Sequence, residues 1–132
     1  KVTLGKNPDL RDRLTVQAAI AKSKTILSSK RLQLHETVAE LWKECCLENT
    51  FSNEQLANVW SASCQAVTET KSMLTEIYSV AGTASLYTKS RIERAHRDIH
   101  AVAQHGIIQP HWLNQAGMVY AGLNPTAAMF NI

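Results

Sequence analysis

The sequence predicts an all-α protein folded as an up-down bundle of four helices. Five glycines and three prolines among 132 residues are too few for a β-sandwich or barrel, which needs a tight turn every ~8–12 residues. The chain also has no run of alternating β-branched residues and no Asn-Gly or Asp-Gly turn. Because a chain of this length forms about one domain, we expect residues 1–132 to be a single helical domain.

We expect the first helix to span residues 8–48. Asn7-Pro8-Asp9 is a typical helix start, with an Asn cap, a proline in the first turn and an acid after it. No glycine or proline interrupts residues 9–48, which predicts one long helix or two helices joined by a slight bend near Ser28-Ser29. Apolar residues recur at every seventh position along it, namely Ile20, Leu27, Leu34 and Leu41.

The second helix is predicted over residues 52–80. Ser52 and Gln55 have the spacing of a capping box, and Gly82 supplies the stop. Trp42 on the first helix and Trp60 on the second lie on apolar stripes. We therefore expect both indoles to lie in the core.

Two shorter helices follow, at residues 90–105 and 109–122. Ser90 and Glu93 form a second capping-box pattern, and Gly106 ends the third helix. Pro110 lies in the first turn of the fourth helix, and Gly122 closes that helix. Short connections between four helices are typical of an up-down bundle.

Charge and cysteine content exclude some classes of protein. Fourteen basic and 11 acidic residues give a net charge of +3 without clusters of like charge, so we expect no nucleic-acid partner. The chain has no stretch of ~18 apolar residues, so we expect no membrane partner. Three cysteines are an odd number and two are adjacent, which predicts reduced thiols and a cytoplasmic protein.

The last quarter of the chain carries no formal charge. Residues 99–132 contain no Asp, Glu, Lys or Arg, although a helix on a free surface normally carries such residues. We therefore expect this segment to be buried against a partner. The chain starts at Lys1 without a methionine, which we interpret as part of a longer protein.

Four of the five histidines lie within residues 96–111. His96 and His100 have the i, i+4 spacing that can hold a metal ion. A carboxylate-bridged metal pair in a bundle, however, needs Glu-x-x-His motifs from two helices. Glu93 precedes His96 by three residues, but no second helix carries a matching motif, so we predict no metal site.

His105 is the last residue before the Gly106 turn, on the same helix face as Arg94, Asp98 and Ala101. One interpretation is an imidazole that stabilises the C-terminus of its helix. The other is a histidine beside a cofactor, because imidazole donates or accepts a proton near neutral pH.

The small-residue loop Ala81-Gly82-Thr83-Ala84-Ser85 also has two interpretations. It can simply end the second helix, or its backbone N–H groups and hydroxyls can bind a phosphate.

Residues 81–106 read AGTASLYTKSRIERAHRDIHAVAQHG. They resemble the C-terminal domain of the acyl-CoA dehydrogenase superfamily, in which a glycine loop precedes an Arg and then an Arg-Asp pair. Gly82, Arg94 and Arg97-Asp98 occupy these places. The match is closest to the two-component flavin-dependent monooxygenases, which carry a His two residues after Arg-Asp and a Gln-His at the helix end, as His100 and Gln104-His105 do.

The resemblance implies a longer enzyme that hydroxylates an aromatic or polycyclic substrate with O₂ and reduced flavin, either FMN or FAD. A separate flavin reductase would supply the reduced flavin. The resemblance further implies a homotetramer joined through these bundles, and an N-terminal helical domain and a middle β-domain without which this chain is inactive. His105 would be catalytic, and the cofactor-binding residues would be Gly82, Thr83, Ser85, Arg94, Arg97, Asp98 and His100.

Two alternatives remain. Many acyl-CoA dehydrogenases carry a catalytic Glu followed by Gly about nine residues after the Arg-Asp pair, whereas this chain has His105-Gly106 near that place. An acyl-CoA dehydrogenase would therefore need a base from another helix. The second alternative is a non-enzymatic helical oligomerisation domain.

Overall fold

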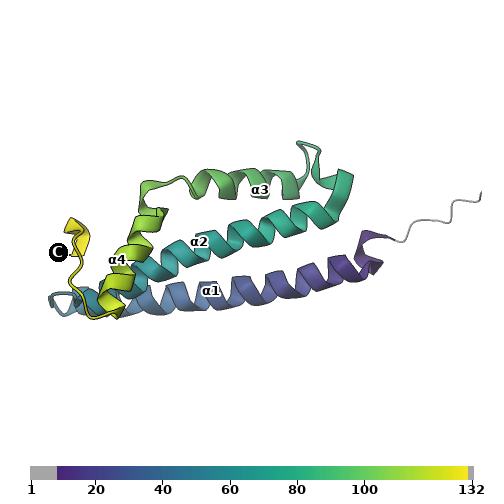
Figure 1. The fold of residues 1–132 in the computed structure, drawn as a ribbon. Helices are drawn as coiled ribbons and strands as arrows, with labels where there is room; N and C mark the ends of the chain where they lie inside the picture. The colour runs from purple at the N-terminus through teal and green to yellow at the C-terminus, as the bar shows by residue number, and fades with distance from the viewer. Residues whose placement is uncertain (1–8, 131–132) are drawn as a thin grey trace, which may run out of the picture.

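The structure, a computed structural model, describes residues 9–130. These residues form four α-helices and no strand, which confirms the predicted all-α fold (Figure 1). The helices are α1 (Leu14–Cys46), α2 (Asn53–Ala81), α3 (Arg91–Val102) and α4 (Pro110–Tyr120). None of the helices in this part of the chain combines the length and apolar character needed to cross a membrane.

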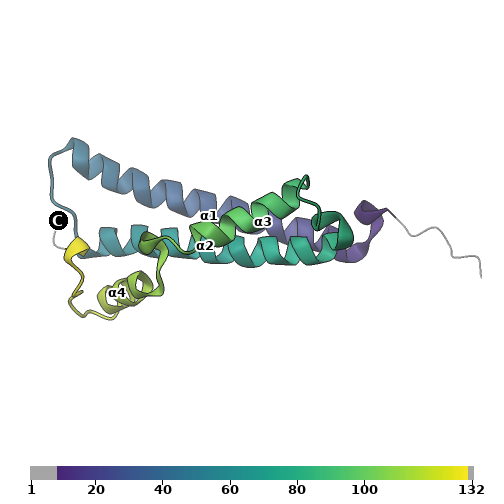
Figure 2. The same cartoon turned by 90° about the horizontal axis from the view of Figure 1, so that it is seen from above.

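The central element is α2, which packs against each of the other three helices. Helix α1 runs antiparallel to it, because Lys22 pairs with Glu76 while Lys30 pairs with Glu69. Helix α3 packs beside the C-terminal part of α2 and α4 beside its N-terminal part (Figures 1 and 2). With 12 and 11 residues, α3 and α4 are each too short to follow the 29 residues of α2, so they cover it in succession.

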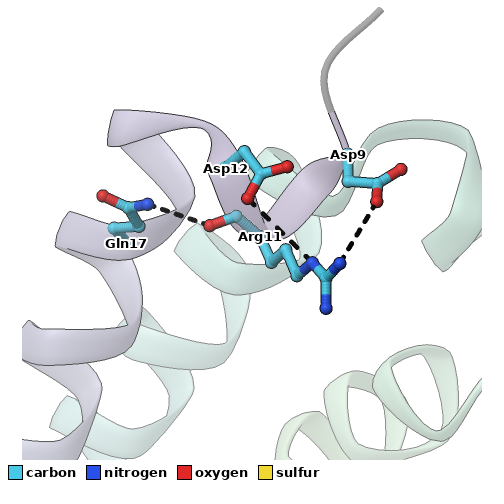
Figure 3. A network of polar contacts seen from close by, with 4 residues as sticks. All are labelled: Asp9, Arg11, Asp12 and Gln17. Carbon is cyan, nitrogen blue, oxygen red and sulfur yellow. Dashed lines mark hydrogen bonds and ion pairs between the residues drawn. The ribbon is translucent and has the colours of Figure 1, made fainter.

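Helix α1 begins at Leu14, later than predicted, and continues without a break through Ser28-Ser29. Residues Leu10–Asp12 form a 3-10 turn, and Arg13 after it is extended. Asp9 makes no side-chain cap; Asn7 and Pro8 lie outside the described residues. Arg11 instead lies 3.7 Å from Asp9 and 4.0 Å from Asp12, and the Gln17 amide donates to the Arg11 carbonyl at 3.0 Å (Figure 3).

Helix α2 matches its sequence signal closely. The Ser52 hydroxyl accepts from the Gln55 N–H, and the Gln55 side chain accepts from the Ser52 N–H, so the predicted capping box is confirmed. Helix α3 ends at Val102 rather than at residue 105. Gln104 N–H donates to Ala101 and His105 N–H to Val102, so the last turn tightens to i→i−3 bonds.

The main core lies where α4 meets α2. Trp60 stacks on Trp112 with ring centroids 4.6 Å apart. The buried members of this cluster are Leu56, Ala57, Cys64, Trp112, Ala116 and Phe130. Phe130 brings the end of the uncharged segment back onto the bundle.

The prediction that Trp42 is a core residue is wrong, because its side chain is 69% exposed. Among the described helices, α1 packs extensively on α2 alone, and α2 covers one stripe of its surface. Leu34 and Leu41 are partly buried, whereas Ile20 and Leu27 remain about half-exposed. The apolar stripe formed by the seven-residue repeat on α1 therefore extends beyond the surface that α2 covers.

Candidate functional site

His105 lies between α3 and α4, where it caps the 3-10 turn Gly106–Ile108 (η3). Its Nδ1 accepts a hydrogen bond from the Ile107 N–H at 3.3 Å. A neutral imidazole that accepts at Nδ1 carries its proton on Nε2. Because the residue is exposed, this Nε2–H group is available to an external acceptor.

An open, largely apolar hollow adjoins the ring. It is lined by Ala101, Val102, Gln104, His105, Ile107 and Ile108. Val102 and Ile107 are 47% and 43% exposed, so each retains apolar surface that a bound group would cover. The arrangement offers a hydrogen-bond donor at the edge of an apolar platform, which suits a flat ring that carries a polar oxygen.

The segment that carries His105 is fastened to the core. The Trp112 indole N–H donates to the Gly106 carbonyl at 2.8 Å. The Cys64 thiol lies 3.8 Å from the Ile107 carbonyl oxygen and 4.0 Å from that of Gln109. Burial raises the pKa of this thiol, so it stays protonated and donates.

The Gly82–Ser85 loop is a 3-10 turn (η2) at the opposite end of α3. Gly82 has φ +60°, which side-chain-bearing residues rarely adopt. Ser85 is buried, and its hydroxyl lies 3.0 Å from the Tyr78 carbonyl oxygen and 2.6 Å from that of Gly82. Thr83 is exposed, so its hydroxyl can meet a ligand directly whereas that of Ser85 cannot.

The outer face of α3 carries exposed charged residues. Arg94 lies 3.6 Å from Asp98, and Arg97 lies 3.9 Å from Glu93. The Arg94–Asp98 pair is exposed and therefore weak. Arg97 is also exposed, although its partner Glu93 is largely buried, so both guanidinium groups can turn to a stronger anionic ligand.

His100 lies on the other face of α3, against α2. Its ring packs at 4.6 Å from that of His96, and its Nε2 is covered. This position does not suit direct contact with a cofactor. Across residues 9–130, no three His, Cys, Asp or Glu side chains gather as a metal site.

Comparison with known proteins identifies the family. The family model described as "Acyl-CoA dehydrogenase, C-terminal domain" matches residues 1–110. The chain belongs to this family. No curated protein sequence matches it.

A solved structure shares the fold of this acyl-CoA dehydrogenase C-terminal domain. It is the crystal structure of 3-HSA hydroxylase from Rhodococcus sp. RHA1, with a TM-score of 0.82 and 20% sequence identity. The similarity covers 90% of this chain and 31% of the hydroxylase chain. The domain thus spans about a third of the length of that enzyme.

Within the acyl-CoA dehydrogenase C-terminal domain, the predicted site residues fall at separate places along α3. The loop with Gly82 and Thr83 precedes the helix and His105 follows it, so about 18 Å of helix lies between them (12 residues at ~1.5 Å per residue). Ile107 and Ile108 complete the hollow but were not among the site residues predicted from the sequence. Two consecutive isoleucines directly after Gly106 in an uncharged segment were the available signal.

Proposed function

We propose that this chain is the C-terminal domain of a cytoplasmic flavin-dependent monooxygenase that hydroxylates an aromatic or polycyclic substrate. The observation that carries the proposal is His105, which presents an Nε2–H donor beside an apolar hollow. The fold shared with 3-HSA hydroxylase supports the same reaction class. The free thiols of Cys45, Cys46 and Cys64 agree with a reducing compartment.

The hollow suits one edge of a flavin or the flat ring of a substrate. Reduced flavin supplies the two electrons that allow one atom of O₂ to enter the substrate and the other to leave as water. Val102, Ile107 and Ile108 exclude water from the bound ring. His105 donates from Nε2 to an oxygen atom held in the hollow, and the Ile107 N–H keeps the imidazole in this tautomer.

The remaining cofactor contacts follow α3 toward its N-terminus. Arg94 and Arg97 offer exposed cations to the phosphate of FMN or FAD, and Asp98 orients Arg94. Thr83 and the backbone at Gly82 extend this surface to the loop. Ser85 and His100 support it from inside, through the loop carbonyls and the α2–α3 contact.

A homotetramer, with flavin shared between subunits, fits the apolar surface of the uncharged segment. Tyr120 and Leu123 are large side chains outside the hollow that remain exposed in the single chain. Another subunit would cover them. Reduced flavin would come from a separate reductase, which would dock on the complete enzyme.

The acyl-CoA dehydrogenase alternative requires a base to remove the proton next to the thioester carbonyl. A carboxylate is the usual choice in this superfamily, but the hollow has no acidic residue among its six lining side chains. Residues 99–132 also contain no Asp or Glu. The hollow therefore favours hydroxylation over dehydrogenation.

The test is His105→Gln in the complete enzyme, with a flavin reductase, NADH and a panel of phenolic and polycyclic aromatic compounds. We expect hydroxylated product per O₂ consumed to fall about 100-fold, the scale of a lost proton-transfer group, and H₂O₂ release to rise. His111→Gln, an exposed histidine outside the hollow, is the matched control and should keep wild-type coupling.

Other results would overturn the proposal. If His105→Gln and the wild type formed the same amount of hydroxylated product per O₂ consumed, His105 would have no role in the reaction. Oxidation of acyl-CoA with an artificial electron acceptor, without NADH-driven hydroxylation, would support the dehydrogenase. A stable oligomer with neither activity would support the non-enzymatic oligomerisation domain.

A further inference from the structure

Helix α3 has an unusually polar contact with α2. None of its 12 residues is fully buried. The half-buried residues of this helix are Ile92, Glu93, Ala95, His96, Ile99 and His100. The position of this short helix therefore depends strongly on how its two histidines pack.

The two histidines continue an aromatic stack that begins on α2. The Tyr78 and His96 ring centroids are 4.4 Å apart at an interplanar angle of 29°. The His96 and His100 centroids are 4.6 Å apart at 46°. Both imidazoles fit this stack when neutral, because two imidazolium rings at this distance would repel each other.

The charged surroundings oppose a proton on His100. Lys71 of α2 and His96 of α3 both act against the imidazolium, and loss of solvent is the largest cause of the lowered pKa of His100. Tyr78 is the other titratable group that faces the stack from α2, and Glu93 lies on the same face of α3. The 3-10 turn η2, which also contacts α3, has no ionisable side chain.

Two polar atoms on this face have no partner in the described part of the chain. The atoms are His100 Nε2 and Glu93 Oε2, and both are covered. An imidazolium carries an N–H group on both ring nitrogens, so protonated His100 must hold an N–H at Nε2 without an acceptor among residues 9–130, whereas the neutral ring can carry its proton on Nδ1 instead. Opening of the α2–α3 contact would give this group access to water.

The inner face connects directly to His105. The Ala103 N–H donates to Ile99 at 3.0 Å, the Gln104 N–H to Ala101 at 3.1 Å and the His105 N–H to Val102 at 3.0 Å. These bonds join His105 and the hollow to the last turn of α3, which is the turn that carries His100.

We propose that His96 and His100 form a proton-sensitive latch in which the neutral rings, stacked on Tyr78, hold the end of α3 against α2 and thereby position His105. Protonation of His100 releases the last turn of α3 and withdraws His105 from the hollow. His100 is thus a positioning residue for the reaction proposed above. The latch itself does not depend on whether the enzyme catalyses that reaction.

Amide hydrogen exchange tests the latch without any activity. The ordinary pKa of histidine is 6.5. As pH falls below this value, we expect protection of the Gln104 and His105 amides to decrease by up to about tenfold per pH unit, because the open form binds one more proton, on His100, than the closed form does. His100→Phe keeps a flat ring without a titrating nitrogen and should remove this pH dependence. His100→Ala should lower protection at every pH.

His35→Phe, an exposed histidine on α1, is the matched control and should retain the wild-type pH dependence. The latch is overturned if wild-type protection stays constant between pH 7.5 and 5. It is also overturned if His100→Phe loses protection on acidification as the wild type does.

Coupling of O₂ consumption to hydroxylation then tests the positioning role. At acidic pH, His100→Phe should retain more coupling than the wild type, whereas His105→Gln loses coupling at all pH values. A wild-type enzyme that shows the exchange transition but no hydroxylation would refute the proposed function and leave the latch standing.

Discussion

The Trp60 and Trp112 rings lie face to face with their centroids 4.6 Å apart, and this stack joins α4 to α2. Trp112 also donates its indole N–H to the Gly106 carbonyl. The same side chain therefore packs in the core and fastens the segment next to His105. Core stability and the geometry of the hollow are coupled through this residue.

Trp112→Phe should show this coupling. Phenylalanine keeps an aromatic ring beside Trp60 but leaves the Gly106 carbonyl without its donor. We expect a loss of about 0.5–1.5 kcal/mol in the free energy of unfolding, the net contribution of a typical intramolecular hydrogen bond, measured by urea denaturation. Trp42→Phe should change stability by less than ~0.5 kcal/mol, because that indole is largely exposed. Equal effects of the two substitutions would contradict the role of the hydrogen bond.

Substitutions at Ser85 and Thr83 should affect different properties of the loop, namely its stability and its binding of flavin. Ser85→Ala removes the hydroxyl that bonds to the carbonyls of Tyr78 and Gly82, and we expect a loss of about 1–3 kcal/mol in thermal or urea unfolding. Thr83→Ala affects an exposed residue and should leave stability unchanged. In flavin titrations of the complete enzyme, Thr83→Ala should weaken binding. Weaker binding in Ser85→Ala without loss of stability would argue for direct contact instead.

The three thiols should differ in reactivity. Cys45 and Cys46 are exposed and Cys64 is buried, so a disulfide reagent at pH 7.5 should modify two thiols rapidly and the third only upon unfolding. Burial raises the pKa of Cys64 above its ordinary value of 9.0. The unfolded chain therefore releases this proton first, and stability should fall as pH rises above 9.0. Cys64→Ala should remove this alkaline loss, and three equally fast thiols would show that Cys64 is not buried.

Local signals in the sequence predicted the helix boundaries that depend on neighbouring residues. The Ser52–Gln55 capping box set the start of α2, because both partners lie within one turn. The start of α1 was predicted less well. Arg11 contacts Asp9 and Asp12, and Arg13 is extended, so the helix begins only after this short turn.

For the candidate site, local patterns indicated which residues lie near the ends of α3 but not which of their side chains turn inward. His105 was singled out from its place before Gly106, and the structure puts it at the edge of an apolar hollow. Helical spacing also placed Arg94, Asp98 and Ala101 on one exposed face. Spacing alone did not show that His100 turns inward or that Ser85 uses its hydroxyl within the loop.

By itself, the sequence determined that this protein is helical and approximately where one helix gives way to the next, because capping, glycine and proline effects act between residues close in the chain. The tertiary structure alone decided which faces are covered. Trp42 and Trp60 both lie on apolar stripes, yet only Trp60 packs against the core. Whether a side chain is buried depends on which other helix packs over it, and no local sequence pattern specifies that helix.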